Sequence, residues 1–134
     1  MKTLDYVSIE VAKLLKEKGF NEYCGAYYHL NWDEATEEEC FEIAPNNDFR
    51  NKDNGYRVGA PTLYEAQKWL RKQGDFIVIT PRYSNKYQII EYEYRIIQYT
   101  DLIDKNRKGK LSPVVYESYE ECFNEGILEA LKLI

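Results

Sequence analysis

His29 is the one histidine of this 134-residue chain, and histidine is the side chain best suited to acid–base catalysis near neutral pH. It stands in "AYYHL" (26–30), a stretch typical of a short strand. Catalysis would require a nucleophile or a carboxylate that the fold brings to the imidazole, and the neighbouring sequence supplies neither. We therefore interpret His29 as an ordinary strand residue, and keep open the alternative of a small enzyme with its site near His29, beside carboxylates of the acidic stretch that follows.

An acidic stretch follows, "DEATEEECFE" (33–42), with six carboxylates in ten residues. A cation site needs ligands that converge from a shaped loop, and the later "NKDNG" departs from the EF-hand pattern because Arg50 and Lys52 stand at ligand positions. Paired carboxylates of the glycosidase kind remain open, because the fold sets their separation. The sequence favours a solvated acidic turn.

Other reactive side chains have structural interpretations. The odd set of three cysteines forms no CxxC motif and predicts neither a disulfide framework nor a metal site. Serine-nucleophile, phosphate-cradling and dinucleotide-binding signatures are missing from the sequence. Three hydroxyl residues suit helix caps better than nucleophiles: Ser8, Thr62 and Ser118. We expect no catalytic, cofactor-binding or metal-binding residues and no cofactor, and we favour a non-enzymatic role over an enzymatic one.

The basic loop at residues 105–110 favours a nucleic-acid partner, because its positive charges could meet phosphates while bases stack on exposed tyrosines beside it. The interaction candidates are Tyr87, Tyr99, Lys105, Arg107, Lys108 and Lys110. The charge balance opposes this interpretation, since residues 1–58 carry 7 basic and 12 acidic side chains while residues 59–134 carry 11 of each. We expect no nucleic-acid partner, and keep a nucleic-acid-binding module as the first alternative function.

Three amphipathic segments predict helices. "SIEVAKLLKEKGF" predicts a helix over 9–18 that begins after Ser8 and ends before Gly19. "APTLYEAQKWLRKQG" (60–74) carries a Thr62–Glu65 capping box and ends at Gly74. "ESYEECFNEGILEALKLI" (117–134) has a second capping box at its start, formed by Ser118 and Glu121, and an unbroken apolar face.

The strands follow a period of two. "FIVIT" (76–80) and the alternating "KYQIIEYEYRII" (86–97) predict a hairpin, and segments 26–30 and 40–44 predict a weaker one. We expect a turn at 54–55, a short strand at 114–116 and a solvated loop at 104–110. The fold class is α+β: residues 1–134 form a single domain of order α-β-β-α-β-β-α, with helices packed on one face of a mainly antiparallel sheet.

Two positions carry specific packing expectations. Trp69 lies beside the apolar stripe of its helix, which predicts a core or core-edge residue. Gly126 interrupts the apolar face of the 117–134 helix at a cost of up to about 1 kcal/mol relative to alanine, which predicts a close backbone or large side chain opposite it.

The blocks "VSIEVAKLLKEKGFNEYC", "GAPTLYEAQKWLRK" and "YESYEECFNEGILEALKLI" together resemble a group of small uncharacterised bacterial proteins found near prophage and mobile-element genes. The group's third block more often begins with an alanine-rich, acidic helix start, where this chain has Cys122 and Asn124. The resemblance implies a cytoplasmic accessory protein of a mobile element, and it brings no activity and no catalytic residues.

The sequence as a whole favours a non-enzymatic protein-binding or regulatory role. Thirteen tyrosines and an uneven distribution of charge are compatible with a protein partner or with self-association. No apolar run reaches the length of a membrane span, and no signal peptide is recognisable, so we expect a cytoplasmic protein without a membrane partner.

Overall fold

The computed structural model of the chain describes residues 4–51, 55–104 and 109–134. The α+β class is confirmed, with antiparallel strands throughout the two sheets of the described residues. The chain divides into two compact units, residues 1–66 and 67–134, and each is treated by itself below. The strands belong to two small sheets rather than to the one sheet expected from the sequence, whereas the single domain stays a prediction.

The elements run in the following order along the described residues: α1 (Ile9–Glu17), β1 (Ala26–His29), α2 (Glu37–Cys40), β2 (Phe41–Ile43), β3 (Arg57–Gly59), α3 (Leu63–Lys72), β4 (Asp75–Ser84), β5 (Ile89–Gln98), α4 (Tyr99–Ile103), β6 (Lys110–Leu111) and α5 (Tyr119–Leu131). The division between the two units falls within α3.

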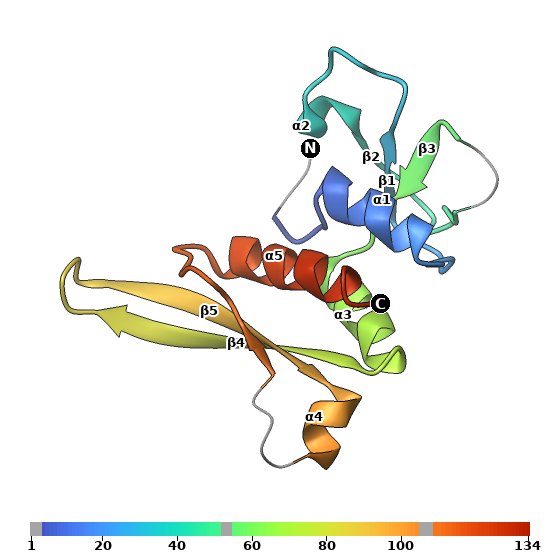
Figure 1. The fold of residues 1–134 in the computed structure, drawn as a ribbon. Helices are drawn as coiled ribbons and strands as arrows, with labels where there is room; N and C mark the ends of the chain where they lie inside the picture. Colours follow the sequence, from blue (N-terminus) through green and yellow to red (C-terminus); the bar gives the residue numbers. More distant parts are fainter. Residues whose placement is uncertain (1–3, 52–54, 105–108) are drawn as a thin grey trace. The chain divides into compact units, whose positions relative to one another are not determined.

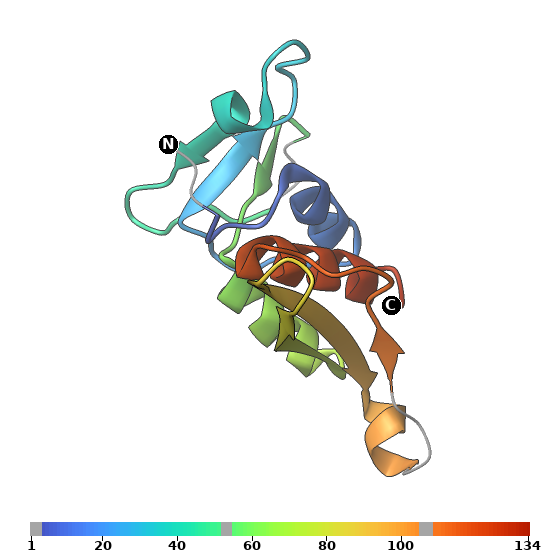
Figure 2. The same ribbon diagram turned by 90° about the vertical axis from the view of Figure 1, so that its left-hand side faces the viewer.

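The first unit holds a sheet of order β2-β1-β3 with α1 packed beside it (Figure 2). The Ser8 hydroxyl caps α1 as the sequence predicts, by accepting a hydrogen bond from the Val11 amide. The Tyr28 side chain of β1 is fully buried, and its hydroxyl donates a 2.6 Å hydrogen bond to the Val7 carbonyl. Burial raises the pKa of Tyr28 above its usual range, which keeps this donor protonated.

The capping box predicted for α3 is present in both directions. The Thr62 hydroxyl accepts from the Glu65 amide at 3.1 Å, and the Glu65 carboxylate accepts from the Thr62 amide at 2.8 Å. Trp69 is buried, as its place beside the apolar stripe predicts. The capping box and the buried tryptophan of "APTLYEAQKWLRKQG" therefore serve to form and pack a helix.

The second unit is a long hairpin of β4 and β5 with α5 lying along one face (Figure 1). All ten residues of β4 pair with β5, so that Ile77 stands opposite Ile96 and Ile79 opposite Tyr94. Tyr94 and Ile96 are buried on the face that the sequence pattern predicts to be apolar.

Gly126 is the point where α5 meets this face. A β-carbon there would lie 3.1 Å from Ile77 Cγ2, 3.2 Å from Tyr94 Cγ and 3.3 Å from Tyr94 Cβ. The expected close approach is confirmed, and the neighbours are side chains rather than backbone.

The outer edge of β4 is protected at two places. The backbone amide and carbonyl of Tyr92 are both bonded to Tyr116, so they point away from β4. Pro81 stands opposite Tyr92 in the β4–β5 ladder and therefore forms a pair without hydrogen bonds, which directs the Pro81 nitrogen toward the outer edge of β4. Proline has no amide hydrogen, which removes a donor that an incoming strand would need. The Gln67 side chain donates to the Ile77 carbonyl at 3.1 Å and occupies a second outward-pointing group.

Four short elements were not expected from the sequence: α2, β3, α4 and β6. They have two to five residues each, too few for a hydrophobic period to show. The strand expected at 114–116 is present only as an isolated bridge between Tyr116 and Tyr92. Part of the expected turn at 54–55 and part of the loop at 104–110 lie outside the described residues.

Candidate functional site

The alternation of β1 places Tyr27 and His29 on the side of the first sheet that faces away from its core. Burial along the strand alternates between the buried Ala26 and Tyr28 and the half-buried Tyr27 and His29. His29 is therefore a strand residue, as expected, and its ring lies on the outer face.

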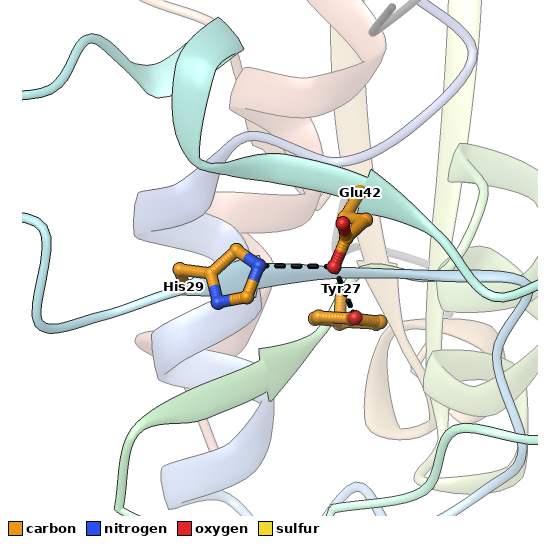
Figure 3. Close-up of polar contacts among 3 residues, drawn as sticks. All are labelled: Tyr27, His29 and Glu42. Carbon is orange, nitrogen blue, oxygen red and sulfur yellow. Dashed lines mark hydrogen bonds and ion pairs between the residues drawn. The ribbon is translucent and has the colours of Figure 1, made fainter.

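Glu42 of β2 joins these two side chains (Figure 3). It stands directly opposite Tyr27 in the β1–β2 ladder, and its Oε2 accepts a hydrogen bond from the Tyr27 hydroxyl. The same oxygen lies 3.0 Å from His29 Nε2. These hydrogen bonds, chiefly that from Tyr27, lower the pKa of Glu42, while the bond to the carboxylate raises the pKa of Tyr27. At neutral pH the carboxylate is ionised and the hydroxyl keeps its proton.

Aromatic rings extend this polar group in both directions. The Trp32 indole stacks on the His29 imidazole with ring centroids 4.0 Å apart and planes within 5° of parallel. On the other side, Phe49 stacks on Tyr27 at 4.8 Å, and the Arg57 guanidinium lies 5.1 Å from the Tyr27 centroid and 5.5 Å from that of Phe49. We call this set the outer-face cluster: Tyr27, His29, Trp32, Glu42, Phe49 and Arg57.

Phe49 lies over Gly59 and is held by its backbone, which exchanges hydrogen bonds with Cys24. Gly59 stands opposite Tyr27 in the β1–β3 ladder, and a β-carbon there would lie 3.5 Å from the Phe49 ring. The buried Asn51 side chain accepts from the Gly59 amide at 2.8 Å and donates to the Phe20 carbonyl at 3.0 Å. The Phe49 ring therefore covers a strand position that has no side chain of its own.

The cluster presents aromatic rings, a guanidinium and a carboxylate on one face of the sheet. The Glu42 side chain is 52% exposed, so the carboxylate is well hydrated. The cysteine thiols of the chain are buried, and burial raises the pKa of Cys24 to about 12 and that of Cys122 to about 11, which suppresses thiolate nucleophiles. Among the described residues, no group of three metal-ligating side chains is present.

Comparisons with protein-family models, with curated proteins and with solved structures found no match. The resemblance to prophage-associated proteins therefore stays a prediction. No helix in the described part of the chain is long and apolar enough to cross a membrane.

The tyrosines predicted from the sequence lie apart from each other. Tyr87 stands in the turn before β5 and Tyr99 begins α4 after it, and both are 61% exposed. The ten residues of β5 separate them by about 30 Å at 3.4 Å per residue, so the two rings do not form one stacking surface.

Of the basic candidates, Lys110 is exposed in β6 and pairs with Ile96. The other three lie outside the described residues: Lys105, Arg107 and Lys108.

Sequence reasoning set His29 beside carboxylates of the acidic stretch only in the small-enzyme alternative, and it did not single out Glu42 or Tyr27. The signal that would have joined them is the hairpin of residues 26–30 and 40–44, whose register places Tyr27 opposite Glu42. The cluster's other members, Trp32, Phe49 and Arg57, come from irregular segments and a three-residue strand, and no local pattern marks them.

Proposed function

We propose that the chain is a non-enzymatic protein-binding or regulatory protein and that the outer-face cluster is its binding surface. The observation that carries this proposal is the exposed stack of Trp32 on His29, joined through Glu42 to Tyr27. Tryptophan, tyrosine and arginine dominate the binding energy of protein interfaces, and all three occur in the cluster.

The rings are held before any partner arrives. Trp32 is 46% exposed although one face of its indole is stacked, and Tyr27 is fixed between the Phe49 ring and the Glu42 carboxylate. Side chains that already occupy one geometry lose less conformational entropy on binding. Such a surface suits recognition of a protein better than an equally exposed set of mobile side chains would.

The small-enzyme alternative has one feature in its favour, since Glu42 comes from the acidic stretch and lies against His29. A histidine–carboxylate pair activates a nucleophile only when one is within reach. The Glu42 carboxylate accepts from the un-ionised Tyr27 hydroxyl, and the His29 ring stacks on Trp32. Recognition of a partner therefore explains the arrangement better than catalysis does.

The cellular setting forms part of the same proposal. The accessory role in a mobile element and the cytoplasmic location derive from the resemblance noted in the sequence. The location has further support from three free, buried cysteines, which are typical of a reducing compartment.

Site-specific photo-cross-linking tests the proposed function. A benzophenone amino acid replaces Asn31, next to Trp32, or in a matched control Asn85, in the turn between β4 and β5; both asparagines are exposed. In cells that naturally make the protein, we expect a protein cross-link from position 31 that Trp32→Ala abolishes, and none from position 85.

Two outcomes would overturn the proposal. Cross-linked RNA or DNA in place of protein would support the nucleic-acid alternative. Equal protein labelling from both positions, insensitive to Trp32→Ala, would show that the outer-face cluster is not the binding surface.

A further inference from the structure

The unit that carries the outer-face cluster holds the chain's excess of negative charge. Residues 1–66 contain seven basic and thirteen acidic side chains, a net charge of −6, whereas residues 67–134 contain eleven basic and ten acidic side chains. A surface with an excess of negative charge attracts positively charged groups and speeds their association with it. A partner of this unit is therefore selected for positive charge.

Part of this charge is attached to the segment that presents Trp32. Asp33 and Glu34 follow the indole directly, and both are exposed. The Trp32 carbonyl accepts from the Ala35 amide at 3.1 Å, which turns the chain at this point. The carboxylates therefore belong to the same short turn as the stacked ring.

The α2 helix adds further carboxylates and is anchored on both sides. A reciprocal capping box joins Thr36 and Glu39, and the Ile9 amide of α1 donates a 2.8 Å hydrogen bond to the Glu37 carboxylate. Glu38 is exposed on this anchored turn. The chain then runs directly into β2, which carries Glu42.

We infer that the occupant of the outer-face cluster is a basic, arginine-bearing segment of a partner protein, an inference that rests on the proposed function. A guanidinium stacks on an indole face and pairs with a carboxylate through two parallel hydrogen bonds, whereas an ammonium offers a point charge without a plane. Trp32 supplies the ring, Asp33 follows it in the same turn, and Glu42 lies against the His29 imidazole on which the ring stacks, while Glu38 adds an exposed carboxylate on α2. The combination of ring and acid is what favours arginine over lysine.

The cluster contains its own example of this contact. Arg57 lies over Tyr27 and Phe49, so the sheet face already accommodates a guanidinium on paired aromatic rings. Trp32 stands on the opposite side of the Tyr27–His29 pair, where its indole stacks on the imidazole. The proposed partner would repeat there, between molecules, the packing that Arg57 makes within the chain.

Peptide binding to the full chain tests the inference. The probes are two fluorescent decapeptides that contain four arginines or four lysines among glycine and serine, and affinities are measured at two salt concentrations. We expect the arginine peptide to bind more tightly than the lysine peptide. Trp32→Ala should weaken the arginine peptide by about 2- to 30-fold, the range of a cation–π contact.

A charge-matched pair of variants separates the site from general attraction. Asp33→Asn/Glu38→Gln removes two exposed charges from the Trp32 turn and from α2, and Glu10→Gln/Glu17→Gln removes two exposed charges from α1 of the same unit. The first pair should weaken the arginine peptide several-fold more than the second. Unchanged thermal melting of all variants shows that they remain folded.

The possible results separate this inference from the proposed function. Equal weakening by both double variants, equal affinity for arginine and lysine peptides, or no effect of Trp32→Ala would overturn the arginine-bearing partner. A protein cross-linked from position 31 whose contacting segment is acidic or neutral, or a second copy of the chain bound through uncharged residues, would overturn it as well while leaving the protein-binding function in place.

Discussion

Substitution of Gly126 by alanine sets two effects of opposite sign against each other. Removing a glycine from the interior of α5 stabilises the helix by up to about 1 kcal/mol. The new methyl group would lie 3.1 Å from Ile77 Cγ2 and 3.3 Å from Tyr94 Cβ, closer than the 3.4–4 Å of ordinary contacts. Tyr94 Cβ is attached directly to the β5 backbone, and both neighbours are buried, so neither can move away freely.

Overpacking of this kind costs typically about 1–3 kcal/mol, so the contact outweighs the gain in helix propensity. We expect Gly126→Ala to lower the free energy of unfolding by about 1 kcal/mol, and by up to about 2 kcal/mol. Urea denaturation measures this directly, because at a slope of about 2 kcal/mol per molar the midpoint falls by about 0.5–1 M.

Two further variants locate the effect. Gly55→Ala is the matched control, because a β-carbon at Gly55 would meet nothing within 4 Å, and its stability should change little. Ile77→Leu removes the Cγ2 branch, so the double variant with Gly126→Ala should lose at least about 0.5 kcal/mol less than the sum of the single losses. A midpoint that rises in Gly126→Ala, or strict additivity with Ile77→Leu, would refute the packing argument.

Three substitutions and one thiol-labelling experiment test the fold. Trp69→Ala should destabilise by about 3–5 kcal/mol in the same urea assay, since the ring is buried; an unchanged midpoint would place it on the surface. Tyr28→Phe should cost about 1–3 kcal/mol, because the buried Val7 carbonyl loses its donor, and a neutral result would mean that water replaces the hydroxyl. Burial raises the pKa of the Cys24 thiol from about 9 in the unfolded chain to about 12, so the stability contributed by the protonated thiol is complete below pH 9 and is lost as the pH rises toward 12. A thiol reagent at pH 8 should therefore label Cys24 only on unfolding, and rapid labelling of the native protein would contradict its burial. Pro81→Thr restores a donor on the β4 edge and should produce concentration-dependent association in sedimentation experiments, whereas a strictly monomeric variant would show that the edge is covered by other means.

The elements that the sequence predicts are those whose hydrophobic pattern repeats over many residues or whose ends carry capping residues. β5 alternates over its ten residues, and α1 and α3 carry their capping residues at the expected positions, whereas the first strand of the hairpin was expected only over 76–80 and continues through Pro81 to Ser84. The same Thr-x-x-Glu signal that marks α3 also begins α2, at Thr36 and Glu39. The acidic composition around it led instead to the expectation of a solvated turn.

The candidate site was less accessible to sequence reasoning, because its members meet only through register and irregular segments. Tyr27 and Glu42 are brought together by a ladder of three residue pairs, and Phe49, which is paired through its backbone with Cys24, lies over Gly59. A three-residue strand such as β3 has no period to detect, and its place in the sheet is decided by tertiary contacts. The sequence therefore identified His29 and the acidic stretch without showing that they touch.

The position of α5 along the chain has a consequence for biosynthesis. The helix that covers Ile77 and Tyr94 begins at Tyr119, well after β5 ends at Gln98, so the ribosome completes the hairpin before its cover exists. At roughly 5–20 residues per second, the apolar face of the nascent hairpin stays open to solvent for seconds. During that interval the hairpin is a substrate for chaperones or for a neighbouring nascent chain, and the missing amide hydrogen of Pro81 already limits strand pairing along its edge.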